Sequence, residues 1–252
     1  MRVETCGAGA DLVLLHGWGM DGGVWEGVKA DLAASFRLHV VDMPGYGASP
    51  TVLPYRLENL VEAIAAAVPE RAHWCGWSLG GLVALEAARR LPQRVARLVL
   101  VASTPCFVQR ADWPCAVAAE ILGEFAAALE GDYEDTLKRF LALQARGDAA
   151  AKTLLRSLRE RLFAHGRPTL EALRGGLAIL RESDLREQAA ELVQPALVVH
   201  GERDLLAPLP AGEWLAAQLP AARLAVFQGA AHAPFLSHPQ EFTRVLTEFL
   251  NE

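Results

Sequence analysis

Residues Gly76-Trp77-Ser78-Leu79-Gly80 form a G-x-S-x-G pattern, in which a serine lies between two glycines. The run His73-Trp74-Cys75 before it is typical of a strand, and the residues from Leu82 to Leu91 have the apolar spacing of a helix. This order predicts a nucleophile elbow, a sharp strand-to-helix turn that presents a serine hydroxyl. Because such a turn packs tightly, side chains at positions 76 and 80 would clash.

Strand-like and helical patterns alternate along most of the chain. Continuous apolar runs predict buried strands at Leu12–Leu15, Leu38–Val41, Leu98–Val101, Ala196–Val199 and Leu224–Phe227. Helical patterns lie between them, at Trp25–Ser35, Leu57–Val68, Leu82–Leu91, Gly212–Gln218 and Gln240–Leu250. The alternation predicts an α/β fold with a mostly parallel, doubly wound sheet and right-handed crossovers.

The alternation is interrupted between about Val108 and Leu185. This stretch lacks a convincing strand and reads as several helices rich in Ala, Leu, Arg and Glu. Because it lies between two strand-bearing parts, it predicts a helical lid inserted into a core domain. We expect residues 1–108 and 185–252 to form the core and residues 109–184 to form the lid.

Composition excludes several classes of protein. The net charge of -6 and the pI near 5.7 argue against a general nucleic-acid binder, and no apolar stretch approaches the length of a membrane span. The N-terminal residues do not resemble a signal peptide. The four cysteines, Cys6, Cys75, Cys106 and Cys115, show no CxxC pairing, and no set of His, Asp and Glu has metal-ligand spacing. We expect a cytoplasmic monomer with reduced thiols and no metal or cofactor.

A serine needs a base within hydrogen-bond reach, and that base needs an orienting acid. The elbow fold presents them in the order Ser, acid, His. Asp204 follows the strand that ends near Val199, and His232 follows the strand that ends near Phe227, so both should meet Ser78 at the carboxyl edge of the sheet. Glu202 is a competing acid and His238 a competing base. The other histidines, at positions 16, 39, 73, 165 and 200, are expected to have structural or surface roles.

An oxyanion hole needs two backbone N–H groups that point at the developing negative oxygen. One is expected from Leu79, directly after the serine. The other is expected from the loop His16-Gly17-Trp18-Gly19 after the first apolar strand, with Trp18 as the donor. Gly17 and Gly19 allow the backbone to approach closely.

Over nearly its whole length the chain resembles the α/β-hydrolase superfamily. The resemblance is closer to the BioH branch, whose members are esterases of the methyl ester of pimeloyl-acyl carrier protein in biotin synthesis. The motifs that carry it are Leu14–Gly19, Val41–Gly47, Gly76–Leu82, Val101–Phe107, Arg139–Gln144 and Ala230–Phe235. The lid motif is more specific than the others, because lids vary most across the superfamily. The tryptophan before Ser78 is also typical of this branch.

The resemblance implies a triad of Ser78, Asp204 and His232, and contacts to the substrate chain from Trp18, Leu79 and Phe140. It also implies an acyl carrier protein as partner, while the charge and the lack of a long apolar run argue against nucleic acid and membrane as partners. A basic lid position that the branch uses for its carrier protein falls near Asp135 here. The expected activity is therefore that of a serine carboxylesterase acting on pimeloyl-acyl carrier protein methyl ester.

The lid has its own charge pattern. From Lys138 to Arg174 it holds nine basic and three acidic residues, within a chain of net charge -6. Lys152, Arg156 and Arg159 share one helical face, and with Arg139 they form the expected docking surface for an acidic carrier protein. The alternative is an ordinary solvated helix face.

The same residues are compatible with two other functions. A general carboxylesterase or a carbon–carbon bond hydrolase would use the same elbow. A hydrolase-fold binding protein without turnover would keep the pocket, although the complete set of serine, acid and histidine argues against it.

Overall fold

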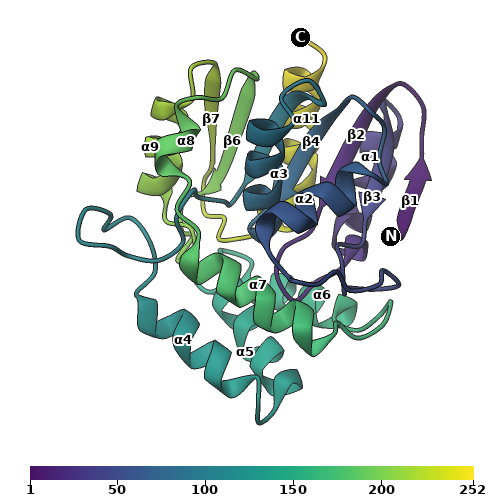
Figure 1. The fold of residues 1–252 in the computed structure, drawn as a ribbon. Coiled ribbons are helices and arrows are strands. Elements are labelled where there is room, and N and C mark those ends of the chain that lie inside the picture. The colour runs from purple at the N-terminus through teal and green to yellow at the C-terminus, as the bar shows by residue number, and fades with distance from the viewer.

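The computed structural model describes all residues from 1 to 252 and contains a central sheet of seven strands (Figure 1). The strands are β1 Val3–Cys6, β2 Ala10–Leu15, β3 Phe36–Val41, β4 Ala72–Trp77, β5 Val95–Val101, β6 Ala196–Gly201 and β7 Ala222–Phe227. Their order in the sheet is β1-β3-β2-β4-β5-β6-β7. Only β1 is antiparallel to its neighbour, and all other pairs are parallel, which confirms the expected fold class.

The helices lie on both faces of the sheet and at one end of it. In chain order they are the 3-10 turn η1 Gly22–Trp25, α1 Glu26–Ala33, α2 Leu57–Ala65, α3 Leu79–Arg90, α4 Ala119–Ala128, α5 Tyr133–Ala145, α6 Ala151–Arg161, α7 Leu170–Glu182, α8 Arg186–Ala189, α9 Leu209–Gln218, α10 Pro234–Ser237 and α11 Pro239–Leu250.

Alternate residues of the strands build two separate apolar layers. Val13 and Leu15 of β2 belong to an apolar cluster with residues of α2, α3 and α9, while Leu12 and Leu14 belong to a second cluster with residues of α1 and α11 on the opposite face. All four side chains are fully buried, as expected for a parallel strand covered on both faces. Both faces of the sheet are therefore covered, and the loops that follow the parallel strands lie at its carboxyl edge.

The expected strands and helices overlap with observed ones, although several bounds differ and the short helices α8 and α10 were not predicted. Helix α3 begins at Leu79 rather than Leu82, because Gly80 and Gly81 interrupt the apolar pattern without breaking the helix. Strand β1 was not predicted, since its short sequence lacks a continuous apolar run and it pairs only at the edge of the sheet, with β3.

Residues 109–184, here called the helical segment, contain α4 to α7 and lie against the carboxyl ends of the parallel strands (Figure 1). The segment is bonded to the core. The N–H of Thr169 donates to the carbonyl of Gly45 at 2.8 Å, and the indole Nε1 of Trp18 donates to the carbonyl of Leu173 at 2.9 Å. Its separation from the core as a lid domain stays a prediction.

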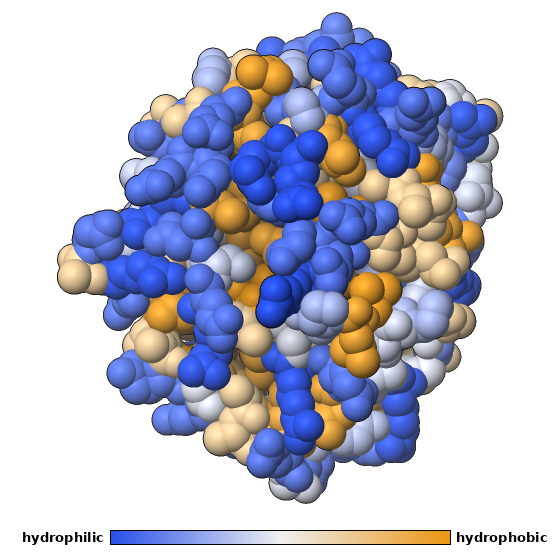
Figure 2. Space-filling model, viewed as in Figure 1, coloured by the Kyte–Doolittle hydropathy of each residue, from blue (hydrophilic) through white to orange (hydrophobic).

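The face of the molecule in Figure 2 is mostly hydrophilic, with hydrophobic residues in several small areas between polar ones. No helix has both the length and the hydrophobicity that crossing a bilayer would require. No group of three or more His, Cys, Asp or Glu side chains is arranged as metal ligands. All four cysteines are free thiols.

Candidate active site

Ser78 lies in the turn between β4 and α3 with a strained backbone, at φ 56° and ψ -116°. The turn packs so closely that only glycine, which has no Cβ, fits at the two glycine positions of the motif. A Cβ atom at Gly76 would lie 2.1 Å from the carbonyl oxygen of Gly80, and one at Gly80 would lie 2.6 Å from that of Leu15. Glycine is therefore required at both positions, as the sequence predicts.

The structure brings the side chains of Ser78, His232 and Asp204 together. The Nε2 atom of His232 lies 2.9 Å from the Oγ atom of Ser78, and its Nδ1 atom lies 2.8 Å from Oδ2 of Asp204. The other carboxylate oxygen accepts the N–H groups of Leu206 at 2.8 Å and Ala207 at 3.0 Å. Because the carboxylate accepts a hydrogen bond from Nδ1–H, it fixes the tautomer in which Nε2 can accept the serine proton.

This constellation is almost completely shielded from solvent. The exposed fraction is 2% for Ser78, 1% for His232 and 4% for Asp204. Electrostatic interactions are stronger in such a dry environment than in water, so the Asp204 carboxylate can stabilise an imidazolium at His232 effectively.

The competing acid and base lie outside this constellation. Glu202 is exposed, and its carboxylate accepts the N–H of Gly229 at 2.9 Å. The Nδ1 atom of His238 lies 2.9 Å from the hydroxyl of Ser237. Neither side chain contacts Ser78, and the structure therefore favours Asp204 and His232.

Two other histidines near the carboxyl edge are completely buried. Burial lowers the pKa of His16, whose Nδ1 donates to the carbonyl of Gly17 at 2.8 Å and whose Nε2 accepts the N–H of Met43 at 2.9 Å. Burial also lowers the pKa of His200 to about 4, and both of its ring nitrogens lack a hydrogen-bond partner. Both rings are thus neutral near pH 7, and neither is hydrogen-bonded to Ser78.

The two expected oxyanion donors lie at the start of α3 and in the loop after β2, and these segments touch, since an added Cβ at Gly80 would lie 2.6 Å from the carbonyl oxygen of His16. The N–H of Leu79 is the first of helix α3 and has no intrahelical acceptor, and the N–H of Trp18 has no protein acceptor. Gly17, next to Trp18, packs against the indole ring of Trp77, where an added Cβ would lie 3.0 Å from the ring. Neither N–H group therefore has a hydrogen-bond acceptor within the protein.

The three expected substrate-contact residues share one apolar cluster. The rings of Trp18 and Phe140 meet edge to face with centroids 4.7 Å apart, and both are buried. An added Cβ at Gly176 would lie 2.7 Å from Trp18 and 3.3 Å from Leu79, which places these two side chains under α7. The cluster therefore joins the elbow to the helical segment.

Gln144 of α5 is a polar residue for which the sequence indicated no role. Its side chain is 1% exposed, and neither its amide oxygen nor its amide nitrogen has a partner. Its backbone carbonyl accepts the N–H of His232 at 3.3 Å. Only the fold shows that this glutamine lies beside the loop of His232.

The basic residues expected to bind a partner are exposed. Lys152, Arg156 and Arg159 of α6 line a surface hollow of about 460 Å³, together with Leu155 and Glu160.

Arg139 on α5 forms an ion pair of 3.1 Å with Asp135, one turn away. Arg156 lies 4.0 Å from Glu160. Lys152 and Arg159 have no ion pair, so they are the free cations of this face.

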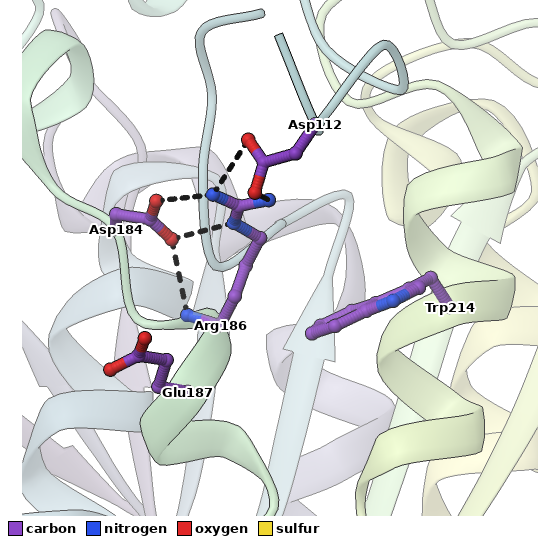
Figure 3. A pocket seen from close by; sticks show the side chains of 5 residues that line it. All are labelled: Asp112, Asp184, Arg186, Glu187 and Trp214. Carbon is purple, nitrogen blue, oxygen red and sulfur yellow. Dashed lines mark hydrogen bonds and ion pairs between the residues drawn. The ribbon is translucent and has the colours of Figure 1, made fainter. Parts of the chain in front are cut away.

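A second hollow, of about 450 Å³, lies away from these residues and is lined by Asp112, Asp184, Arg186, Glu187 and Trp214 (Figure 3). Its only cation is fully engaged. The guanidinium of Arg186 binds Asp184 at 2.7 Å and Asp112 at 3.0 Å, and it lies over the ring of Trp113. These contacts brace two loops, and no nucleophile lines the hollow.

Comparisons with known proteins agree with this geometry. A family model described as the alpha/beta hydrolase fold matches residues 12–239. A protein of Nitrosomonas europaea named pimeloyl-[acyl-carrier protein] methyl ester esterase is 47% identical over 242 residues, which cover 96% of each chain. A protein of the same name from Aeromonas hydrophila is 45% identical over 252 residues, 99% of each chain.

Solved structures show the same likeness. A hydrolase from Pseudomonas aeruginosa superposes with a TM-score of 0.83 at 29% identity and covers 99% of this chain and 94% of that one. An esterase from Exiguobacterium antarcticum has a TM-score of 0.89 at 24% identity and covers 100% and 95%, which shows the shared fold.

Proposed function

The chain belongs to the α/β-hydrolase family, and we propose that it is a serine carboxylesterase that hydrolyses the methyl ester of pimeloyl-acyl carrier protein to methanol and the free acid. The observation that carries this proposal is the hydrogen-bonded series Ser78, His232 and Asp204, with distances of 2.9 and 2.8 Å. The relatives named above support the substrate, because their likeness extends over nearly the full chain.

The first half of the reaction acylates Ser78. The Oγ atom attacks the ester carbonyl carbon while Nε2 of His232 takes the hydroxyl proton. Asp204 stabilises the resulting imidazolium, and the N–H groups of Trp18 and Leu79 bind the oxyanion. The tetrahedral intermediate then expels the methoxy group, which takes the proton from His232 and leaves as methanol.

The second half releases the acid. A water molecule attacks the acyl-enzyme carbonyl and gives one proton to His232. The second tetrahedral intermediate breaks the bond to Ser78, whose oxygen recovers a proton from the imidazolium. The products are the free pimeloyl carboxyl group on its carrier and the regenerated enzyme, and no step requires a cofactor.

The buried cluster around Trp18 supports a site for an acyl chain. Apolar side chains of Trp18, Leu79 and Phe140 would contact the methylene groups of the substrate. Burial of each methylene group would contribute about 0.8 kcal/mol to binding. Because Ser78 is only 2% exposed, the ester reaches it after side chains between the helical segment and the core move apart.

The exposed basic face of α6 supports docking of an acidic carrier protein. Lys152, Arg156 and Arg159 would meet its carboxylates, with Arg139 at the edge of the contact. Exposed ion pairs contribute only about 0.2–1 kcal/mol each, so this face would mainly steer encounter and orient the partner.

The test uses the purified protein with pimeloyl-acyl carrier protein methyl ester and, in parallel, with a short p-nitrophenyl ester. The proposal predicts release of methanol from the carrier-bound ester at a kcat/KM well above that for the short ester. The gene should also restore growth of a biotin auxotroph that lacks its own methyl esterase. Hydrolysis of the short ester alone, with no complementation despite good expression, would identify a general carboxylesterase instead.

A further inference from the structure

The loop that carries His232 is bonded to the junction between helices α5 and α6. The N–H of His232 donates to the carbonyl of Gln144 at 3.3 Å, and the N–H of Ala149 donates to the carbonyl of Gly229 at 2.9 Å. Between these contacts, the N–H of Ala231 donates to Oδ2 of Asp148 at 2.9 Å. The helical segment thus holds the loop at three successive points.

Asp148 supplies the only side chain among these contacts. It is 6% exposed, and its second oxygen, Oδ1, accepts the N–H of Ala150 at 2.7 Å at the start of α6. Its carboxylate therefore connects the start of α6 with the residue directly before His232. Hydrogen bonds from N–H groups to a charged carboxylate are stronger than those between neutral groups.

The core holds the same histidine from the other side. The indole Nε1 of Trp77 donates to the carbonyl of His232 at 2.7 Å. The main chain of His232 is therefore fixed between Trp77, which precedes the nucleophile, and the junction that contains Asp148. Loss of either support would allow the imidazole to move relative to Ser78.

We propose that Asp148 is a positioning residue of the helical segment that keeps the imidazole of His232 within hydrogen-bond distance of Ser78. This inference rests on the proposed function, because it assigns His232 as the base. Asp148 acts through the N–H of Ala231 and does not touch the reacting atoms. A misplacement of about 1 Å in a catalytic group can cost on the order of 100-fold in rate, so one lost anchor has a measurable effect.

Two substitutions remove the anchor to different degrees. Asp148→Ala loses both hydrogen bonds. Asp148→Asn keeps the size and one accepting oxygen, but its NH₂ group cannot accept the second N–H. We expect kcat for a short p-nitrophenyl ester to fall about ten-fold or more in Asp148→Ala and by less in Asp148→Asn, while KM changes less than about three-fold.

The neighbouring helix offers a matched control. Asp132 begins α5 and accepts the N–H of Asp135 at 3.0 Å, so it caps a helix of the same segment without contact to the His232 loop. Asp132→Ala removes one cap hydrogen bond of the segment, so it should lower the melting temperature and leave kcat within about two-fold. This control separates loosening of the helical segment from misplacement of the base.

The experiment measures kcat, KM and the rate at which a fluorophosphonate modifies Ser78, all well below the melting temperature of each variant. The labelling rate reports activation of the Ser78 hydroxyl whichever ester the enzyme prefers. A lower labelling rate in Asp148→Ala therefore supports the inference independently of the substrate. A wild-type protein that is labelled but does not hydrolyse the carrier-bound ester would refute the proposed function alone. Wild-type kcat and labelling in Asp148→Ala, or equal losses in Asp132→Ala, would overturn the role of Asp148.

Discussion

The imidazole Nε2 of His232 lies 2.9 Å from the hydroxyl oxygen of Ser78, although 154 positions separate the two residues in the chain. Parallel strands explain this proximity. Strand β4 ends at Trp77, directly before the serine, and β7 ends at Phe227, a short loop before the histidine. Since parallel strands bring their carboxyl ends to one edge of the sheet, the fold collects the reacting groups there.

Asp204 is predicted to act through the tautomer of His232. In Asp204→Asn, an amide NH₂ can face Nδ1 and favour the tautomer that places the proton on Nε2, where it cannot accept the serine proton. We expect kcat to fall by roughly 10⁴-fold with little change in the structure. Steady-state kinetics together with a circular dichroism spectrum checks this result, and a loss below about ten-fold would remove Asp204 from the mechanism.

Gly76 is predicted to tolerate no side chain. The Cβ of Gly76→Ala would lie 2.1 Å from a backbone oxygen, which no rotamer change can relieve. We expect the free energy of unfolding to fall by about 3 kcal/mol or more, with loss of esterase activity. Urea denaturation measures it.

Gly123 provides the control for this substitution. It lies within α4, and an added Cβ would meet nothing within 4 Å. Gly123→Ala should raise the free energy of unfolding by up to about 1 kcal/mol, because alanine is the better helix former. Equal effects at positions 76 and 123 would contradict the packing of the elbow.

Stability should decrease in acid because of His200. Its pKa is lowered by burial to about 4 from an ordinary value of 6.5, so the unfolded chain takes up the proton first as the pH falls. Above about pH 6.5 His200 is neutral in both the folded and the unfolded chain and does not change the free energy of unfolding. Between pH 6.5 and 4 only the unfolded chain is protonated there, so the free energy of unfolding falls. At pH 5 the loss is about 2 kcal/mol.

His200→Leu removes this proton linkage. At pH 8 the variant should be as stable as the wild type or slightly more so, because the buried ring nitrogens have no partner. Its advantage should grow by about 2 kcal/mol on going to pH 5. Urea denaturation at both pH values tests this, and parallel pH profiles of the two proteins would refute it.

The charge of α6 should matter for the carrier-bound substrate only. Arg156→Glu should raise KM for that ester a few-fold at low salt, and the effect should shrink as salt is added. Arg244→Glu is the matched control, because Arg244 also pairs with a glutamate one turn away, Glu248, on the exposed face of α11, at 2.9 Å. An equal change in both variants, or a change with the short ester, would argue against docking on α6.

The sequence was sufficient for the parts of the site that follow local rules. Ser78 is revealed by the glycines that its strained turn requires, and Asp204 and His232 by their positions directly after apolar strands. Continuous apolar runs alternate with helical patterns, and this predicted the parallel sheet, because strands covered on both faces are apolar throughout.

Contacts between distant segments could not be predicted in this way. Asp148 lies 83 positions from Ala231, and nothing in its neighbourhood in the sequence distinguishes it from an ordinary loop aspartate. The indole of Trp77 and the backbone carbonyl of Gln144 are equally ambiguous until the fold places them beside His232. Strand β1 escaped prediction because an edge strand needs no apolar run.

The activation of Ser78 by His232 is tested most sharply by the site and rate of modification by a fluorophosphonate, read by mass spectrometry of the digested protein. We expect one adduct, on Ser78, which is absent in Ser78→Ala and forms far more slowly in His232→Ala. An unmodified Ser78 in the folded wild-type protein, or an undiminished rate without the imidazole of His232, would contradict it.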